Sequence, residues 1–342
     1  MLPAVGHFAC VAPGFDAAAG VVEAALALVQ ALVQAYQRLG DQLAAGGSGQ
    51  RCQHRPKRRL RPGRTAAYDA PHLTPRSARM PITRTVQQLH DLTGRTALVT
   101  GGSRGLGFQM AQALGEAGAR LLISARKADE LTHAVVRLRE QGISADWVVA
   151  DAGDEAGALA LADAAMAQLG HVDILVNNAG TTWGAPAEDH PTAAWDKVMD
   201  LNVRGLFLLS REIAKRSMIP RAYGRIVNTA SIAALGGSME MQAAAYHASK
   251  GAVASLTRAL ACEWGRHDIT VNAILPGVFP SRMAKHLASG DTGARIAAAL
   301  PLRRLGDDEG LKGAVLLFAS DAGKHITGQL LAVDGGASAV VG

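Results

Sequence analysis

The sequence has few cysteines and few aromatic residues, and it lacks an apolar run long enough to cross a bilayer. Cys10, Cys52 and Cys262 are the only cysteines, and they form no CxxC pair. Such an odd and sparse set excludes a disulfide framework and a cysteine-based zinc site. The histidines show no metal-ligand spacing either. We therefore expect no bound metal, no membrane partner and a cytoplasmic location.

The excess of positive charge is confined to one end of the chain. The formal net charge is +6, with 10 Lys/Arg against 4 Asp/Glu before Met80 and 25 of each from Met80 onward. The basic balance therefore belongs to the N-terminal segment. The remaining sequence gives no electrostatic reason to expect a nucleic acid as its partner.

The segment before Met80 differs in composition from the rest. Residues 1–50 are rich in alanine and glycine, with apolar residues at helical spacing from Val21 to Ala45. Residues 51–79 are basic and contain four prolines, which favours disorder. A nucleic-acid-binding arm and an organelle-targeting peptide are the functional alternatives. We expect residues 1–79 to be a largely disordered extension or not part of the natural product, followed by one catalytic domain over residues 80–342.

From Met80 onward, short apolar runs alternate with helical patterns, and there are no internal repeats. Seven strands separated by helices predict an α/β fold with a doubly wound, Rossmann-type parallel sheet flanked by helices. The longest expected helices cover residues 105–117, 203–217 and 246–265. The expected strands cover residues 96–100, 120–124, 147–150, 173–176, 225–228, 270–274 and 329–333.

The first expected strand ends in a glycine-rich turn, which reads Thr-Gly-Gly-Ser-Arg-Gly-Leu-Gly over residues 100–107. Before a helix, such a turn directs backbone N–H groups and the positive end of the helix dipole at a pyrophosphate. Gly101 permits the tight turn, Gly105 lets the backbone approach the phosphates, and Gly107 lets the helix pack against the strand. A glycine motif alone also fits an ordinary turn, but the strand before it and the helix after it favour a dinucleotide site.

The choice of cofactor is expected at the end of the second strand, about twenty residues after the glycines. A carboxylate there would bind the ribose 2′-hydroxyl and repel a 2′-phosphate. This chain instead has Ser124-Ala125-Arg126-Lys127. Arg126 and Arg104 both offer guanidinium groups to a phosphate, although solvated surface cations are the alternative. The sequence therefore predicts NADP(H) rather than NAD(H).

Tyr246 and Lys250 lie four residues apart at the start of an expected helix, so they share one face. A phenol has a pKa near 10 and is a poor base at neutral pH. We expect the neighbouring ammonium, together with a cationic nicotinamide, to lower the pKa of the Tyr246 phenol. Tyr246 would then exchange a proton with a carbonyl or alcohol oxygen. A chance surface pair is the alternative interpretation of this spacing.

The chain resembles the classical short-chain dehydrogenase/reductase family from about Leu92 to Gly342. Four motifs carry the resemblance, in the family's order and on the expected elements. They are TGxxxGxG at residues 100–107, NNAG at residues 177–180, YxASK at residues 246–250 and PG at residues 276–277. The resemblance implies hydride transfer between a nicotinamide cofactor and a ketone/alcohol pair, in an enzyme that is commonly a homotetramer.

The resemblance also implies a role for individual residues. Tyr246 corresponds to the acid/base, Lys250 to its tuning and ribose-binding partner, and Ser231 to the serine that binds the substrate carbonyl. Asn202 corresponds to the asparagine that seats a water in the proton relay. The implied cofactor-binding residues are Gly101, Ser103, Arg104, Gly105, Leu106, Gly107, Arg126, Asp151, Asn177, Ala179, Gly180, Tyr246, Lys250, Pro276, Gly277, Val278 and Ser281.

Two features of the sequence bear on the substrate. Ser231 and Tyr246 are 15 residues apart (246 − 231), about two more than is usual for the family, which predicts a longer substrate loop with Ser238 as an alternative to Ser231. The overall pattern is similar to 3-oxoacyl-(acyl-carrier-protein) reductases. The longer loop and the segment after Pro276 are similar to gluconate 5-dehydrogenases. Apolar lining is expected from Trp183, Met239, Met241, Phe279, Met283 and Leu287.

Three alternatives stay open at this point. A sugar acid would need a cation inside the pocket, which Arg282 or Lys285 would supply. An acyl carrier would need cations at the mouth, for which Arg266 is a candidate. The chain would otherwise be a catalytically silent NADP(H)-binding sensor or assembly subunit, an interpretation that the presence of both Tyr246 and Lys250 disfavours. The expected partner is a small-molecule or acyl-thioester carbonyl compound.

Overall fold

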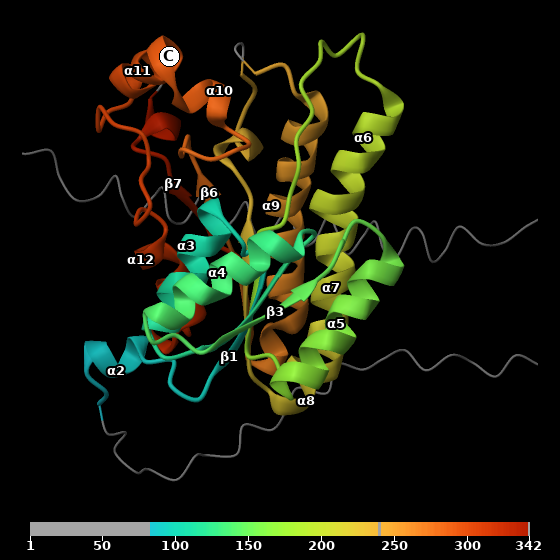
Figure 1. Ribbon diagram of the computed structural model, residues 1–342, viewed down its shortest axis with the longest axis vertical. Coiled ribbons are helices and arrows are strands. Elements are labelled where there is room, and N and C mark those ends of the chain that lie inside the picture. Colours follow the sequence, from blue (N-terminus) through green and yellow to red (C-terminus); the bar gives the residue numbers. More distant parts are fainter. Residues whose placement is uncertain (1–82, 239–240, 341–342) are drawn as a thin grey trace, which may run out of the picture. The chain divides into compact units, whose positions relative to one another are not determined.

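The computed structural model describes residues 83–238 and 241–340. The expected extension over residues 1–79, its helix from Val21 to Ala45, and Met239 lie outside the described residues. The described part contains a seven-stranded sheet (Figure 1). Its strands are β1 (Thr96–Thr100), β2 (Arg120–Ala125), β3 (Ala145–Val149), β4 (Ile174–Asn177), β5 (Gly224–Thr229), β6 (Ile269–Pro276) and β7 (Leu330–Val333).

All neighbouring strands pair in parallel, in the order β3-β2-β1-β4-β5-β6-β7. The order reverses between β1 and β4, and this is the switch point at which doubly wound sheets bind ligands beyond the carboxyl ends of their strands. The predicted seven-stranded, Rossmann-type fold is confirmed. The glycine-rich turn follows β1, so the topology places it at this switch point.

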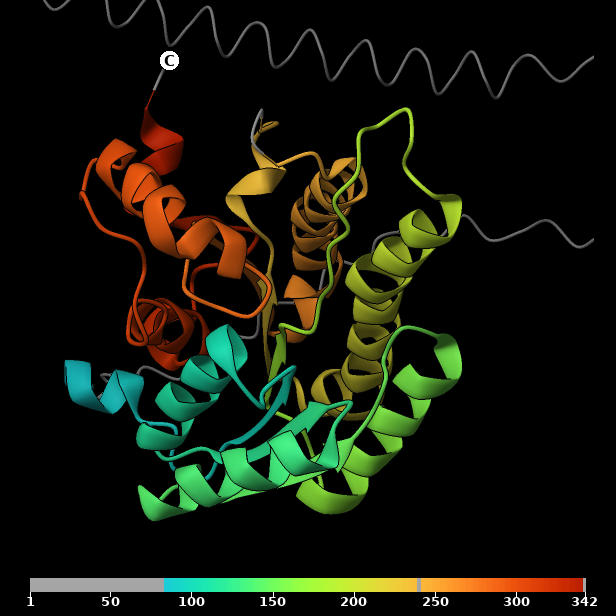
Figure 2. The ribbon, with the colours of Figure 1, turned by 45° about the horizontal axis from the view of Figure 1, so that its top comes forward.

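Helices cover both faces of the sheet (Figures 1 and 2). One face carries α3 (Gly105–Glu116), α4 (Ala128–Glu140) and α12 (Lys312–Ala319), and the other carries α5 (Glu155–Leu169), α7 (Leu206–Ile213) and α9 (Ala244–Trp264). Shorter helices complete the layers. They are α2 (Val86–His90), α6 (Thr192–Met199), α8 (Ile219–Arg221), α10 (Lys285–Ala288) and α11 (Gly290–Ala299).

The core divides between the two faces because successive strand residues point in opposite directions. Within β1, Ala97 and Val99 belong to the core on the side of α3, α4 and α12, whereas Leu98 belongs to the core on the side of α5 and α7. Both faces are therefore apolar, and β1 and β4–β6 are buried along their whole length. This explains why these strands read as continuous apolar runs rather than as alternating patterns.

The element boundaries differ from the expected ones in particular places. β3 begins at Ala145, two residues earlier than expected, because Ala145 pairs with Leu121 of β2. The expected helix over residues 203–217 is part of a longer helical run over residues 192–221. That run is α6, α7 and α8 joined by two π-helical segments, Asp200–Gly205 and Ala214–Met218.

The amino ends of the strands are held by a cluster of charged and aromatic side chains. Arg225 of β5 is 2% exposed and lies 3.3 Å from the carboxylate of Asp321. The guanidinium groups of Arg225 and Arg95 lie 4.4 and 3.8 Å from the ring centroid of Tyr223. Cation–π contacts and ion pairs therefore join segments that are distant in sequence.

None of the helices in the described ranges 83–238 and 241–340 has the length and apolar character needed to span a membrane.

Candidate active site

The glycine turn adopts a conformation that only glycine accommodates at several positions. Gly101 and Gly105 have φ values of +65° and +54°. A Cβ on Gly107 would lie 2.2 Å from the carbonyl oxygen of Gly101 and 2.4 Å from Nδ2 of Asn178. A Cβ on Gly105 would meet only Ser281, 3.9 Å away. The turn is therefore tight on its inner side and open toward the cavity, as a phosphate cradle requires.

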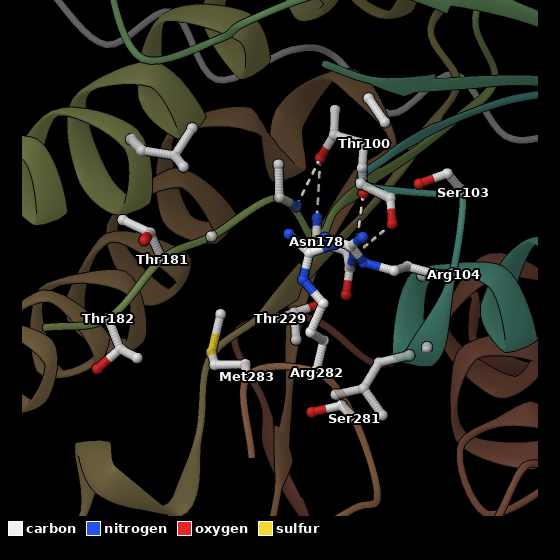
Figure 3. A pocket seen from close by; sticks show the side chains of 18 of the residues that line it. Thr100, Ser103, Arg104, Asn178, Thr181, Thr182, Thr229, Ser281, Arg282 and Met283 are labelled. Carbon is white, nitrogen blue, oxygen red and sulfur yellow. Dashed lines mark hydrogen bonds between the residues drawn. The ribbon is translucent and has the colours of Figure 1, made fainter. Parts of the chain in front are cut away.

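Hydrogen bonds fix the glycine turn to the end of β4. The hydroxyl of Thr100 accepts from the backbone N–H groups of Asn178 and Ala179, at 2.9 and 3.0 Å. The side-chain amide of Asn178 donates to the carbonyls of Thr100 and Gly101, at 3.0 and 3.2 Å (Figure 3). Thr100 therefore has a positioning role that the sequence interpretation missed, although its place before the first glycine was a signal.

A cavity of about 1000 Å³ opens at the carboxyl ends of the strands. Figure 2 shows the segment that carries α10 and α11 on one side of this end and the loop before α6 on the other. Most of the predicted site residues line the cavity, whereas Asn177, Asn202 and Val278 do not. Those in its wall are Gly101, Ser103, Arg104, Gly105, Leu106, Gly107, Arg126, Asp151, Ala179, Gly180, Ser231, Tyr246, Lys250, Pro276, Gly277 and Ser281.

Tyr246, Lys250 and Ser231 meet at one end of this cavity. Tyr246 and Lys250 come from the first two turns of α9, and Ser231 follows β5. Ser231 makes a side-chain hydrogen bond with Tyr246, and Nζ of Lys250 lies 5.6 Å from the centroid of the Tyr246 ring. Ser238, the alternative serine, accepts instead from the backbone of Met241. The structure therefore brings Ser231 to the tyrosine despite the longer loop.

The pKa of Tyr246 in the polypeptide alone is determined mainly by burial. Burial raises the pKa of the Tyr246 phenol, and the hydrogen bond from Ser231 opposes this only in part. Burial also lowers the pKa of Lys250 to about 8. Burial of the phenol therefore outweighs the hydrogen bond from Ser231 in the polypeptide alone, and the expected lowering by Lys250 together with a bound nicotinamide stays a prediction.

Lys250 is held from behind by the main chain. Its Nζ donates a 2.7 Å hydrogen bond to the carbonyl oxygen of Thr229 at the end of β5, and the side chain is 5% exposed. A Cβ on Gly180 would lie 3.7 Å from Nζ of Lys250 and 3.2 Å from Oδ1 of Asn202. Gly180 therefore leaves the space that these two side chains border. A carbonyl such as that of Thr229 carries no residue-type signal that sequence reasoning detects.

Asn202 lies behind the cavity wall, in the π-helical segment, and is 1% exposed. Its Oδ1 accepts from the backbone N–H of Thr181 at 2.8 Å, and its Nδ2 donates to the Thr181 carbonyl and to Oγ of Ser249. The Ser249 hydroxyl in turn donates to the carbonyl of Tyr246 at 2.8 Å. The side chain of Asn202 thereby links the loop after β4 to the helix that carries Tyr246. Its expected role with a water stays a prediction.

Asn177 fixes the central strands below the cavity. Its side-chain amide donates to Oγ of Ser210 and to Oδ1 of Asn228, both at 2.9 Å. The side-chain amide of Asn228 in turn donates to the hydroxyl of Thr257 in α9, also at 2.9 Å. These buried groups satisfy one another, so they join β4, β5, α7 and α9 without a net charge.

A group of cations lies on the glycine-turn side of the cavity. Arg104 donates through Nη1 to both carboxylate oxygens of Glu130 at 2.7 Å, and Arg282 donates to Oε1 of Glu130 at 3.3 Å. Nζ of Lys127 lies 3.5 Å from the same oxygen. Arg126 is exposed and lines the cavity without a hydrogen bond or ion pair to any described residue. Sequence reasoning missed Glu130, since no motif marks it.

The end of the cavity near Tyr246 is less charged. Thr181, Thr182, Leu201 and Met283 line the cavity, and Met283 is 44% exposed, whereas Phe279 also lines it but belongs to the core on the side of α3 and α12. Of the other residues expected as apolar lining, Trp183 is exposed, whereas Met241 and Leu287 are half-buried. Lys250 is the cation that α9 places beside Tyr246.

The residues of the cavity fit a bound nicotinamide dinucleotide. The open cradle over Gly105, the helix that begins at this glycine and the four surrounding cations suit phosphates. The described residues contain no group of three or more His, Cys, Asp and Glu side chains arranged to hold a metal ion.

Comparison with known proteins agrees with the site. The family model described as enoyl-(acyl carrier protein) reductase matches residues 101–338. The chain belongs to the short-chain dehydrogenase/reductase family. As a short-chain dehydrogenase/reductase, it is an oxidoreductase that acts on CH–OH groups.

Two curated relatives of this short-chain dehydrogenase/reductase have named reactions. The rhamnolipids biosynthesis 3-oxoacyl-(acyl-carrier-protein) reductase of Pseudomonas aeruginosa is 42% identical over 249 residues, covering 72% of this chain and 96% of the relative. The gluconate 5-dehydrogenase of Gluconobacter oxydans is 36% identical over 252 residues, with the same two coverages of 72% and 96%.

Solved structures show the same fold. A gluconate 5-dehydrogenase from Burkholderia cenocepacia in complex with NADP and tartrate is 34% identical, with a TM-score of 0.71, over 75% of this chain and 100% of that one. The NADP active-site complex of Pseudomonas aeruginosa RhlG is 40% identical, with a TM-score of 0.69, over 73% of this chain and 99% of that one.

Proposed function

We propose that this chain is an NADPH-dependent ketone reductase that uses Tyr246 as its proton donor and acts on a 3-oxoacyl thioester. The observation that carries the proposal is the convergence of Tyr246, Ser231 and Lys250 at one end of a cavity whose other end is a phosphate cradle. A bound nicotinamide supplies the hydride. The protein's own groups then have to bind the carbonyl oxygen and protonate it.

The protonation state of Tyr246 supports the reductive direction. Because burial raises the pKa of its phenol, Tyr246 keeps its proton at neutral pH and can donate it to an alkoxide as that charge develops. Ser231 lies within hydrogen-bonding reach of the phenol and is placed to donate to the same substrate oxygen. Lys250, with a pKa of about 8, is the positive charge beside the phenolate that forms.

The preference for NADP(H) rests on the cations around the cradle. Arg126 and Lys127 follow β2, where a carboxylate would select an unphosphorylated ribose, and Arg104 lines the same cavity from the glycine turn. Arg126 has no described partner that it must give up. The NADP bound in two neighbouring structures supports the same preference. We expect kcat/KM with NADPH to exceed kcat/KM with NADH by at least tenfold. Equal efficiencies would contradict the preference.

The 3-oxoacyl substrate is supported by the walls near Tyr246. A sugar acid needs a cation there; the candidate Arg282 is bound to Glu130 on the other side of the cavity, and the side chain of the second candidate, Lys285, lies outside what the structure describes. Thr181, Leu201 and Met283 instead offer hydroxyl and apolar surface. Gluconate-type substrates stay the second candidate because gluconate 5-dehydrogenases are among the relatives. With NADPH, turnover of an acetoacetyl thioester should exceed turnover of 5-ketogluconate, and the reverse order would favour the second candidate.

The role of Tyr246 is tested by Tyr246→Phe, which removes the hydroxyl and keeps the ring. We expect kcat to fall at least a thousandfold while the Kd for NADP⁺ stays within threefold, since the proton donor is lost and the cradle is unchanged. Tyr223→Phe is the matched control, because Tyr223 lies in the charged cluster at the amino ends of the strands. Retained turnover in Tyr246→Phe would disprove the assigned role. Absence of turnover in the wild type, with NADP⁺ bound, would favour the silent-sensor alternative.

We also propose that residues 80–342 carry the activity alone, so that deletion of residues 1–79 leaves kcat unchanged. The homotetramer and the cytoplasmic location stay predictions from the sequence.

A further inference from the structure

Glu130 joins three parts of the chain at the edge of the cavity. It lies in the first turn of α4, and its carboxylate binds Arg104 of the glycine turn, Lys127 before α4 and Arg282 of the segment after β6. Its side chain is 22% exposed, whereas those of the three cations are 47%, 56% and 64% exposed. One carboxylate is thus shared by three positive charges, which leaves an excess of positive charge at this point.

The position of Arg282 differs from the one the sequence suggested. Arg282 follows Ser281 and precedes Met283, so it belongs to the segment expected to border the substrate. Its Nη1 shares Oε1 of Glu130 with Arg104. Figure 3 shows its side chain directed toward Arg104 and Asn178, with Thr181, Thr182 and Met283 on the other side. Arg282 therefore reaches Glu130, which also binds Arg104 of the glycine turn.

Both arginines keep donors available. A guanidinium carries five N–H donors in a planar fork, and a single nitrogen, Nη1, engages Glu130 in each case. Among the residues described by the structure, Nε and Nη2 of Arg104 and Arg282 have no hydrogen-bond partner. Because both side chains line the cavity, these donors are available to an anion inside it. Glu130 would then orient the two guanidinium groups without using their full hydrogen-bonding capacity.

We propose that Arg282 binds a phosphate of the cofactor and that Glu130 is the residue that positions Arg282 and Arg104 for this contact. The inference rests on the proposed function, in which this cavity takes NADP(H). The ligand chemistry is a phosphate, supplied either by the 2′-phosphate or by the pyrophosphate. Arg282 thereby ties the segment after β6 to the cofactor, and the same segment carries Ser281 and Met283 at the substrate side.

The first test measures binding apart from turnover. Titration calorimetry on the full chain gives the Kd for NADP⁺ and for NAD⁺ in Arg282→Ala and in Lys324→Ala. The second variant removes an exposed positive charge outside the cavity. We expect Arg282→Ala to raise the Kd for NADP⁺ at least tenfold over that of Lys324→Ala. An equal rise for NAD⁺ identifies the pyrophosphate as the ligand, and a rise confined to NADP⁺ identifies the 2′-phosphate.

Steady-state kinetics separate cofactor from substrate. With saturating NADPH, Arg282→Ala should leave the KM for the ketone within twofold of the wild-type value. A raised KM for the ketone with an unchanged Kd for NADP⁺ would overturn the proposal, because Arg282 would then serve the substrate. Unchanged values of both constants would overturn it too, because Arg282 would then be a solvated cation.

The positioning role of Glu130 is tested through the arginines. Glu130→Ala should raise the Kd for NADP⁺ at least fivefold, and Glu130→Asp should recover part of that loss. In the Arg104→Ala/Lys127→Ala/Arg282→Ala background, Glu130→Ala should change the Kd by less than twofold, because all the cations that bind its carboxylate are gone. Asp129→Ala is the matched control, since Asp129 is an exposed acid in the same turn. An equal rise in both backgrounds, or tighter NADP⁺ binding in Glu130→Ala, would overturn this role.

Failure of the proposed function and failure of the Arg282 assignment give different binding results. A wild-type chain that binds neither dinucleotide would defeat the proposed function. A wild-type chain that binds NADP⁺ with the same Kd as Arg282→Ala would defeat the assignment of Arg282 alone.

Discussion

Replacing Lys250 with methionine should stabilise the protein at neutral pH while abolishing turnover. Burial lowers the pKa of Lys250 from 10.5 to about 8, so folding places a poorly hydrated charge in the site. At 1.36 kcal/mol per pKa unit, this penalty is about 3.4 kcal/mol. The 2.7 Å hydrogen bond to the Thr229 carbonyl stabilises the wild type by about 1 kcal/mol, and Lys250→Met loses this contribution. We expect the free energy of unfolding at pH 7 to be about 2 kcal/mol higher in Lys250→Met.

The pH dependence of this difference provides the sharper test. Well below pH 8, lysine is charged in the folded and the unfolded state, and the whole penalty acts on the wild type. Between pH 8 and 10.5, the folded protein holds fewer protons than the unfolded chain, so the free energy of unfolding of the wild type rises with pH. Above pH 10.5 both states are neutral and the penalty is gone.

Urea unfolding at pH 7 and pH 10 measures the effect. The stability advantage of Lys250→Met should shrink by about 2.5 kcal/mol between these pH values, so that it vanishes or reverses. Lys324→Met is the matched control, because Lys324 is exposed, and its difference from the wild type should be the same at both pH values. A difference between wild type and Lys250→Met that does not change from pH 7 to pH 10 would refute the reasoning.

Two substitutions test the framework of the site. Gly107→Ala places a Cβ 2.2 Å from the Gly101 carbonyl oxygen, so the backbone of the glycine turn must shift. We expect the Kd for NADP⁺ to rise at least tenfold and the free energy of unfolding to fall by about 2 kcal/mol. Gly313→Ala in α12, where an added Cβ meets nothing within 4 Å, should raise stability by about 0.5 kcal/mol, and an equal loss in both variants would contradict the steric argument. Asn177→Ala leaves the buried Ser210 and Asn228 without their donor, and urea unfolding should show a loss of about 2 kcal/mol. A change below about 0.5 kcal/mol would show that these bonds contribute little.

The fold was predictable because its signals are local. Apolar runs, the glycine turn at Gly101 to Gly107 and the i, i+4 spacing of Tyr246 and Lys250 each depend on a few consecutive residues. The expected element boundaries were wrong where pairing between segments distant in sequence determines where an element begins. The start of β3 follows from its register with β2, and no local sequence pattern marks the π-helical segment that contains Asn202.

The candidate site was predictable to the same extent. The motifs supplied Ser231, Tyr246 and Lys250, because their residue types and order carry the signal. The direction of the Tyr246 pKa was not predictable from spacing, since the extent of burial decides it. Glu130 was missed because a carboxylate gains this role through arginines that lie 26 residues before it and 152 residues after it in the chain.

The charged cluster at the amino ends of the strands stabilises the fold at a distance from the residues proposed for catalysis. Arg225, Tyr223 and Asp321 close one margin of the sheet, and the cavity occupies the opposite margin. The two sets share no residue, so the chemistry can diversify at one rim while the other anchors the scaffold. In a library of random variants, heat-sensitive variants should therefore cluster around Tyr223, and variants of altered substrate selectivity should cluster around Met283.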